Sequence, residues 1–454
     1  MTRRVAASMA GGTNPHLLRR ARMPALAGRD PVGYAEHAFL LFLIVFPAMG
    51  TLVLPSSSFS DGGSPSPLSA FDIGKLTFYP SALGLVILCA ARYREVIATA
   101  LKALPILTFS VWAFVSCLWA PEFLAAFNTT GRMFVIVLGA VYISARMAPI
   151  DIIRILTQAF AISIAISLIC VLLFPRIGYN STLMGYESAW RGAMAQKNFL
   201  GGLMTYGVIV GYYANLYRSN LRIVSLFVLF GAMVMTVMAQ SATSIISVVV
   251  TAFVLCLLAF INNARNNFEK SISLWLLFAS IAMFLFATVF SEELFQLIGR
   301  SSNLTGRSEI WPLVWGLIQN NPVRGYGHTF WTLESPVKLA LWAQGGWKIA
   351  HAHNAYLDIW LQTGLPGLVI AILFILKGFG RTITLVVRGV SPIGFFWSAL
   401  FFVAFAKSFT ETQWVDPNAS TIFWTTLAYI GLVNLSQARP QQLAPADVSR
   451  QPAT

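Results

Sequence analysis

Charged residues are scarce in this sequence. Asp, Glu, Lys and Arg make up only 11% of its 454 residues, whereas hydrophobic residues make up 57%. A soluble globular chain contains about 25% charged residues, so the lipid bilayer is the expected solvent for this composition. Within a bilayer every backbone N–H and C=O group must be paired inside the protein, which excludes open sheets and favours helices.

Cysteine is also rare. The four cysteines, Cys89, Cys117, Cys170 and Cys256, all fall inside apolar runs. We therefore expect free thiols in membrane helices, with no disulfide framework and no cysteine-based metal cluster.

Neither end of the sequence has the pattern of a membrane segment. The first 35 residues lack an apolar core followed by a small-residue cleavage site, so no cleavable signal peptide is expected. Residues 1–35 and 438–454 are polar or rich in Gly, Pro and Gln, and we expect both to be disordered cytoplasmic tails.

Long apolar runs fill the rest of the chain. They predict an all-α polytopic membrane protein with about 12 transmembrane helices, because a span needs about 20 mostly apolar residues. The predicted spans are 37–54, 73–91, 103–119, 132–148, 152–174, 199–216, 221–239, 242–261, 272–290, 355–376, 392–407 and 419–436.

The basic residues predict the orientation. With the N-terminus inside, most of the 31 Lys and Arg residues fall on the cytoplasmic side, as in the short loops 92–102 and 377–391. The net charge of +14 is therefore interpreted as a topology signal and not as a nucleic-acid surface. The predicted organisation is a transmembrane bundle over 36–290 with a short periplasmic loop at 175–198, a large periplasmic loop at 291–354, and further transmembrane helices over 355–437.

The large loop contains a predicted helix. Apolar residues recur at helical spacing from Ile310 to Ile318, and Thr305 is a candidate N-cap. Trp311 and Trp315 on this helix are typical of interfacial anchors. A structured loop of this length is usually functional.

Three of the five histidines, His328, His351 and His353, lie in this loop. The His-x-His pair suggests either a metal site or a general base. The metal interpretation lacks a supporting Cys or carboxylate pair. A neutral imidazole at the membrane boundary can accept a proton from a hydroxyl, and Asp358 is a candidate to orient His353.

Some basic residues lie in the predicted outer loops and so depart from the excess of Lys and Arg on the cytoplasmic side. Arg191 and Lys197 precede a predicted span, and Arg307 lies in the large loop. These positions fit either anion binding, for which guanidinium groups match phosphate oxygens, or contact with anionic lipid headgroups. The polar cluster at Gln240, Ser241, Thr243 and Ser244 is either a tight turn or part of the site.

Three motifs, which follow one another along the chain in the family's order and lie on one predicted face, resemble the O-antigen ligase and polysaccharide polymerase family. One is His353-Asn354, nine residues, and Gly364-Leu365-Pro366-Gly367. Another is Gly306-Arg307-Ser308-Glu309-Ile310-Trp311, followed by Asn321-Pro322-Val323-Arg324-Gly325-Tyr326-Gly327. The third is Arg191-Gly192 with Lys197-Asn198. The resemblance covers about residues 185–376 and looks closest to the exopolysaccharide-production branch.

The resemblance implies a C-type glycosyltransferase-like bundle and a mechanism without metal or cofactor. The donor would be a glycan on undecaprenyl diphosphate, and the acceptor a hydroxyl of a glycan or lipid. His353 would be the catalytic base, and Arg191, Arg307 and Lys197 would bind the diphosphate. The supporting residues would be Asn354, Glu309, Arg324, Asp358 and His351.

The implied function is polymerisation of lipid-linked oligosaccharide repeats into exopolysaccharide or O-antigen, by inverting glycosyl transfer at the periplasmic face of the bacterial inner membrane. A flippase and a chain-length regulator are implied partners. The same family also includes ligases that transfer lipid-linked glycan to lipid A-core. A polysaccharide-related transporter is an alternative of another class, but the distinctive motifs lie in loops and no internal repeat supports it.

Overall fold

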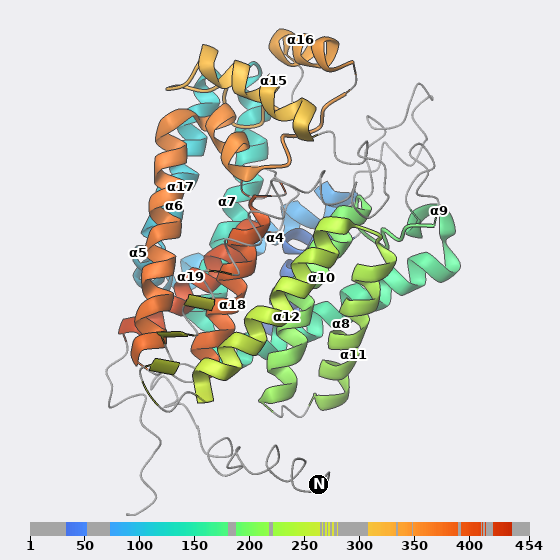
Figure 1. Cartoon of the computed structure of the whole chain (residues 1–454), viewed down its shortest axis with the longest axis vertical. Helices are drawn as coiled ribbons and strands as arrows, with labels where there is room; N and C mark the ends of the chain where they lie inside the picture. The colour runs from blue at the N-terminus through green and yellow to red at the C-terminus, as the bar shows by residue number, and fades with distance from the viewer. Residues whose placement is uncertain are drawn as a thin grey trace, which may run out of the picture.

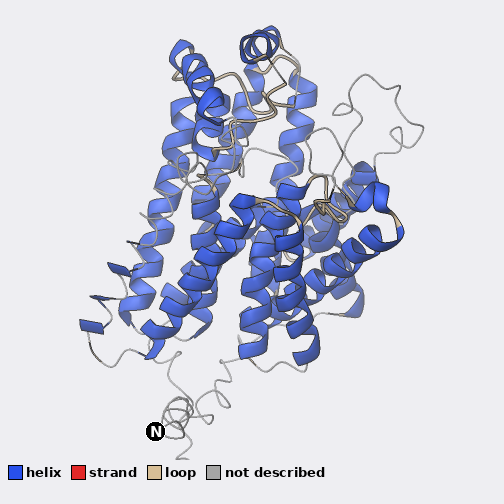
Figure 2. Cartoon of the chain, turned by 45° about the vertical axis from the view of Figure 1, so that its right-hand side comes forward, coloured by secondary structure: helices blue, strands red, loops and turns tan. Residues whose placement is uncertain are grey.

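The computed structural model describes residues 33–51, 73–179, 188–217, 221–263, 307–332, 335–346, 348–388, 392–409 and 421–437, together with isolated positions between 266 and 279, Glu411 and Trp414. Within these residues every extended regular element is a helix (Figure 2), which confirms the predicted all-α class. The free cysteines are as expected, with none of the four in a disulfide.

The helices form a bundle with a smaller helical layer at one end, formed by α15 and α16 at the top of Figure 1. In chain order the helices are α3 (Tyr34–Leu43), η1 (Ile44–Ala48), α4 (Ile73–Ala91), α5 (Tyr93–Lys102), α6 (Leu104–Ser116), η4 (Cys117–Trp119), α7 (Phe123–Arg146), α8 (Pro149–Leu173), α9 (Pro175–Gly178), α10 (Lys197–Leu216), α11 (Arg222–Met238), α12 (Ala242–Asn263), α15 (Arg307–Asn320), α16 (Pro336–Gly345), α17 (Ala355–Arg388), α18 (Pro392–Lys407) and α19 (Thr421–Gln437).

Every predicted span except 272–290, most of which lies outside the described residues, overlaps one or two of these helices. Three helices are long and apolar enough to cross a membrane: α7, α8 and Ala355–Leu385 of α17. A fourth crossing arises if the bent pair α5 and α6 forms one span. The total of about twelve crossings stays a prediction.

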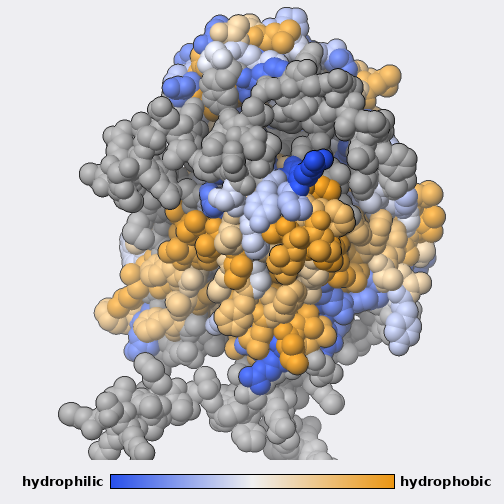
Figure 3. Space-filling model, turned by 90° about the vertical axis from the view of Figure 1, so that its right-hand side faces the viewer, coloured by the Kyte–Doolittle hydropathy of each residue, from blue (hydrophilic) through white to orange (hydrophobic). Residues whose placement is uncertain are grey.

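The outer surface of the bundle is apolar. Figure 3 shows a broad hydrophobic area over the middle of the face formed by α8, α11 and α12, with hydrophilic residues toward its ends. Side chains on this surface include Leu172, Ile223, Phe230 and Val249, which are all exposed. An exposed apolar surface of this extent, beside helices long enough to cross a membrane, is typical of a face that contacts lipid.

The segment 92–102 differs from the short loop that the sequence suggested. It forms helix α5, which buries Val96 and Thr99 against the bundle. A bend of 92° separates α5 from the following helix. Pro105 in the first turn of α6 explains the break, because a proline has no N–H to donate to the carbonyl oxygen four residues earlier and its ring would clash with that carbonyl if α5 continued.

Helix α17 is longer than the predicted span 355–376 and is kinked at Gly364, where φ is +70°. The kink leaves the carbonyl oxygens of Leu361 and Gln362 to accept bonds from Tyr326 N–H and Gly327 N–H, at 2.8 Å each. The Gly-Tyr-Gly turn after α15 is thereby fixed to α17. Two sequence motifs that are far apart in the chain meet at this kink.

Replacement of Gly364 by alanine is expected to destabilise the fold. A Cβ atom there would overlap the carbonyl oxygen of Val323, and the left-handed backbone is strained for any side chain. We expect a loss of about 2–4 kcal/mol in the free energy of unfolding, measured by thermal unfolding of the detergent-solubilised protein. Gly316→Ala is the matched control, because a Cβ atom at Gly316 meets no atom within 4 Å. Equal stability of the two variants would contradict this account.

Candidate active site

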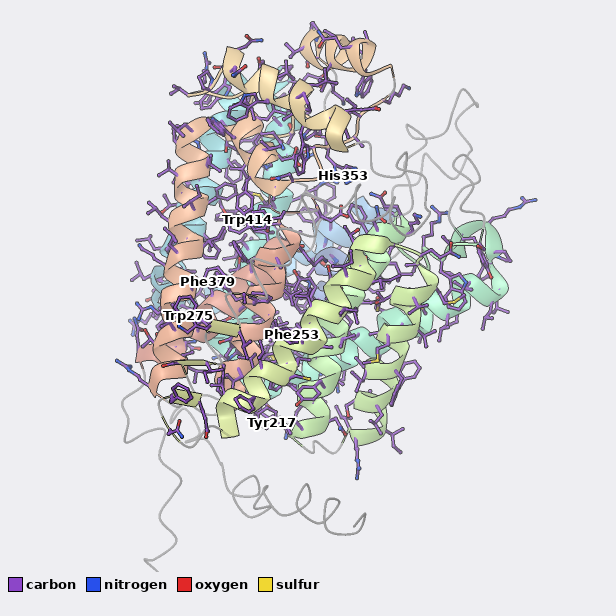
Figure 4. All side chains as sticks on the ribbon, viewed as in Figure 1. Tyr217, Phe253, Trp275, His353, Phe379 and Trp414 are labelled. Carbon is purple, nitrogen blue, oxygen red and sulfur yellow. The ribbon has the colours of Figure 1, made fainter. Side chains whose placement is uncertain are left out.

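His353 lies at the start of α17, on the side of the bundle nearest α15 and α16 (Figure 4). Its neighbour Asn354 caps the helix: Oδ1 accepts from Tyr356 N–H at 3.0 Å and from Leu357 N–H at 3.2 Å. His353 itself has a φ of 52°, an uncommon conformation for a residue other than glycine. The capped helix start and this backbone conformation together set the direction of the imidazole ring.

A second histidine and a carboxylate lie beside His353. The ring centroids of His351 and His353 are 3.9 Å apart, and His351 Nδ1 accepts from His353 N–H at 3.3 Å. Oε2 of Glu411 lies 3.5 Å from Nδ1 of His353, and both side chains are largely shielded. Among the described residues, Nδ1 of His353 has no hydrogen-bond partner, so this carboxylate is the polar group facing it.

Glu411 follows the end of α18 and is connected to two other helices. Oε1 accepts from Thr243 Oγ1 of α12 at 3.4 Å. The amine of Lys407 interacts electrostatically with Glu411 and donates to the carbonyl oxygen of Gly202 in α10 at 2.7 Å. Ser408, between them, accepts from Ala355 N–H of α17 at 2.8 Å. Four helix ends therefore meet around His353.

The chain before His353 is held by a carboxylate and three indoles. Asp358 Oδ1 accepts from Ala352 N–H at 3.1 Å and from the Trp331 indole at 2.6 Å. The Trp311 indole donates to the Ala352 carbonyl oxygen at 3.0 Å, and Trp342 donates to Ile349 at 2.8 Å. Asp358 thus positions the backbone one residue before His353. Trp311, expected as an interfacial anchor, is part of the same support.

Arg191 is engaged by its own loop. Its guanidinium donates to the carbonyl oxygens of Ile177 at 2.7 Å, Arg176 at 3.2 Å and Ala195 at 3.4 Å. Burial lowers the pKa of Arg191 from its ordinary value, which leaves this group charged because that value is far above neutral pH. Arg191 therefore shapes the loop that leads into α10, in addition to any contact with an anion.

Lys197 is the first residue of α10 and is half-buried. Burial lowers the pKa of its amine to about 8. One turn further, a Cβ atom at Gly201 would meet the Ser244 side chain, and one at Gly202 would meet Lys407. The beginning of α10 therefore lies beside the helix ends that surround His353.

The remaining predicted residues lie on or near α15. Arg307 begins α15, and its side chain lies outside the described residues, as does Thr305. Glu309, in the first turn, is exposed. The guanidinium of Arg324 lies 5.0 Å from the centre of the Trp119 ring, beside the kink of α17. This placement favours a stacking role for Arg324, next to the kink and not next to His353.

His328 is a buried structural histidine. Its Nδ1 lies 2.7 Å from Thr130 Oγ1, and its backbone N–H donates to Ser116 Oγ at 3.0 Å. Burial lowers the pKa of His328 to about 4, so its ring is neutral at physiological pH. It ties the loop after α15 to α6 and α7.

The polar cluster after α11 is both a tight turn and a neighbour of the candidate site, which are the two interpretations that its sequence allowed. Gln240 has a φ of 48° in the turn between α11 and α12, and its amide donates to Ser188 Oγ at 2.9 Å. Ser244 donates to Ser241 at 3.0 Å, closing the turn. Thr243, by contrast, faces Glu411. The cluster is a turn with one residue directed to the site.

Sequence reasoning did not single out Glu411, Lys407 or Thr243 as a group. A usable signal was present, because Glu411 is an acid in a short predicted outer segment between spans 392–407 and 419–436. Its pairing with His353 depends on which helix ends are neighbours, and the sequence pattern does not contain that information.

A metal ion would find three donors here. The ligand atoms of His351, His353 and Glu411 lie within 4.8 Å of one another. The amine of Lys407, which interacts with the same carboxylate, opposes a second cation. The arrangement is better suited to acid–base chemistry, in which a histidine exchanges a proton beside a carboxylate.

The fold and site define an integral membrane protein with a histidine–carboxylate site at one end of a helical bundle. A family model described as O-antigen ligase matches residues 224–372. The chain is also similar to the exopolysaccharide production protein ExoQ of Rhizobium meliloti (strain 1021), with 25% identity over 358 residues, covering 75% of this chain and 79% of that protein. Both similarities agree with the resemblance to the O-antigen ligase and polysaccharide polymerase family that the sequence motifs indicated.

Replacement of Trp311 by phenylalanine is expected to loosen the segment before His353. The variant keeps the ring but leaves the Ala352 carbonyl oxygen without its donor, a loss of about 1–2 kcal/mol in stability. Because small displacements of a reacting group are costly, the glycan transfer proposed below is expected to fall about tenfold. Thermal unfolding and a glycan-transfer assay in membranes measure the two effects. Trp315→Phe is the control, since this ring is exposed and packs edge-on against the Trp360 ring of α17. Equal activity of the two variants would show that the indole bond is unimportant.

Proposed function

We propose that this protein polymerises undecaprenyl-diphosphate-linked oligosaccharide repeats into exopolysaccharide or O-antigen. The observation that supports this most is the placement of His353, whose imidazole lies beside a carboxylate at a capped helix start, within a motif of the family. The similarity to an exopolysaccharide production protein supports a role in making an envelope glycan, and the choice of a polymerase is part of the proposal.

In the proposed reaction His353 is the catalytic base. Its imidazole accepts the proton of an acceptor hydroxyl while the hydroxyl oxygen forms a bond to the anomeric carbon of the donor sugar. The bond between that carbon and the diphosphate oxygen breaks, and the electron pair leaves with the lipid diphosphate. Displacement from the opposite face inverts the anomeric centre. No metal ion or cofactor takes part.

The basic residues complete the proposal. Arg307 and Lys197, with Arg191 supporting the loop, bind the diphosphate and stabilise the charge that grows on it as it leaves. Arg324, Glu309 and His351 lie in the surrounding structure. Positive groups at a partly dehydrated surface interact with a diphosphate more strongly than they would in water.

The proposed location is the bacterial inner membrane, with both termini cytoplasmic and His353 on the periplasmic side. The support is the bias of Lys and Arg toward the predicted inner loops. A flippase that delivers the donor and a chain-length regulator are the partners that such a reaction requires. The lipid tail of the donor would lie among the helices.

A ligase is the second candidate, because the matching family model is described as O-antigen ligase. A ligase would use the same base and the same lipid diphosphate. It would differ in the acceptor, which would be lipid A-core or another molecule in place of a growing glycan.

The principal test uses a deletion strain complemented with wild type, His353→Ala or Arg307→Ala, at matched amounts of membrane protein. For a polymerase, each variant is expected to reduce long surface polysaccharide by about 100-fold or more and to leave single lipid-linked repeats, because the glycosidic bond cannot form. Gel analysis of polysaccharide length and mass spectrometry of lipid-linked intermediates provide the measurement. Glu122→Gln, at an exposed carboxylate before α7, is the control.

Other outcomes of the complementation experiment would indicate other functions. Long lipid-linked chains that never reach an acceptor would identify a ligase. Normal polymer from His353→Ala would overturn the catalytic assignment and favour a transporter.

The lowered pKa of Lys197 predicts a pH dependence of donor binding. The amine is positive below about pH 8 and loses its charge as pH rises through this value, so the KM for the lipid-linked donor is expected to rise about tenfold between pH 7 and pH 9. Lys197→Arg should remove this rise, because guanidinium remains charged throughout. Lys197→Met should have the high KM at both pH values. The KM for the lipid-linked donor is measured from initial rates of the detergent-solubilised protein at several pH values. Identical pH profiles for wild type and Lys197→Arg would exclude Lys197 from diphosphate binding.

A further inference from the structure

We infer that Glu411 is a positioning residue for His353 and that the reacting base is a histidine–carboxylate pair assembled from two separate parts of the chain. This inference rests on the proposed function, because it assumes that His353 accepts the proton. It adds a residue outside the family match at 224–372. Glu411 belongs to the segment between α18 and α19, which none of the family motifs includes.

The geometry indicates which nitrogen of His353 faces the carboxylate and which nitrogen accepts the proton. Glu411 Oε2 faces Nδ1 of His353 at 3.5 Å, and Nδ1 has no hydrogen-bond partner among the described residues. A carboxylate at this nitrogen favours the tautomer with the proton on Nδ1. The lone pair is then on Nε2, which is the atom that must meet the acceptor hydroxyl. A separation of 3.5 Å is longer than a good hydrogen bond, and such bonds often shorten only when substrate is bound.

The carboxylate is itself held in place. Thr243 of α12 donates to its other oxygen at 3.4 Å, and Lys407 interacts with it electrostatically. The backbone N–H of Glu411 donates to the Lys407 carbonyl oxygen at 3.0 Å, which continues the last turn of α18. A carboxylate held by two side chains on a hydrogen-bonded backbone can orient a ring, whereas a mobile surface carboxylate cannot.

The backbone connects the two partners. Ala355 N–H, two residues after His353, donates to the carbonyl oxygen of Ser408, three residues before Glu411, at 2.8 Å. The start of α17 and the end of α18 are therefore joined directly beside the pair. His353 and Glu411 maintain their separation because the segments that contain them are hydrogen-bonded to each other.

The pair has a defined task during transfer. As the acceptor oxygen bonds to the anomeric carbon, its proton moves to Nε2 of His353, and the ring becomes an imidazolium with protons on both nitrogens. The leaving electron pair departs with the lipid diphosphate. The negative carboxylate of Glu411 stabilises the imidazolium through Nδ1–H without accepting its proton. The stabilisation is greatest when the ring is charged, so it is expected to accelerate the reaction more than it strengthens substrate binding.

The test compares purified wild type with Glu411→Gln, Glu411→Asp and Glu122→Gln in a glycan-transfer assay with a lipid-linked oligosaccharide. Glutamine keeps the size of the side chain and removes its charge, and kcat is expected to fall about 10-fold to 100-fold with KM within about twofold of wild type. Aspartate keeps the charge and is expected to restore part of kcat. Glu122→Gln, at an exposed carboxylate, should match wild type. Thermal unfolding shows whether each variant is folded.

Coupling to His353 is tested by the double variant. If Glu411 acts through His353, Glu411→Gln has little further effect on the residual rate of His353→Ala, since groups that act as a unit are not additive. Thr243→Val, which releases one oxygen of the carboxylate, should give a smaller loss of kcat in the same direction. Independent, multiplicative losses in the double variant would overturn the inference.

The failures of the two proposals are distinguishable. If His353→Ala is inactive while Glu411→Gln retains wild-type kcat, the proposed function stands and the role of Glu411 is refuted. If His353→Ala retains activity, the catalytic assignment of His353 is wrong, and the inference about Glu411 is then also wrong because it depends on that assignment. A Glu411→Gln effect confined to KM would place Glu411 in substrate binding and would also refute the positioning role.

Discussion

A polar backbone group left unpaired in hydrocarbon costs several kcal/mol, and this constraint organises the whole molecule. It makes the described chain almost entirely helical and confines irregular backbone to places where other groups can pair with it. The segment before α17 shows the consequence. Its Ala352 N–H and C=O are both paired, one by Asp358 and the other by Trp311. His353 is held on a non-helical segment because side chains replace the missing helix bonds.

The kink at Gly364 extends the same principle. By leaving its helical path, α17 frees carbonyl oxygens that accept from the turn around Tyr326. The turn around Tyr326 is followed by His328, which is hydrogen-bonded to α6 and α7. The layer of α15 and α16 is therefore joined to the bundle by backbone bonds, so indoles from this layer can hold the His353 segment in a fixed position.

The site combines this rigid support with charges at helix ends. His353, Glu411, Lys407 and Thr243 come from the ends of α17, α18 and α12, and Lys197 begins α10 nearby. Similarity to an O-antigen ligase model and to an exopolysaccharide production protein gives this arrangement a chemical context. In the proposed reaction, a histidine with a carboxylate beside it and cations nearby would match what the transfer of a glycan from a lipid diphosphate needs.

The sequence by itself determined the helical class, the approximate positions of most long helices and the motif that includes His353, because these depend on local hydropathy and on residues close together in the chain. It also indicated Asn354 and the glycines, whose roles are local in the backbone. The tertiary structure decided the rest. It assigned Glu411 to His353, Asp358 and Trp311 to Ala352, and Arg191 to the carbonyl oxygens of its own loop. These pairs join segments that are separated in the sequence or that a turn brings together. They form only when the helices have packed and their ends have become neighbours.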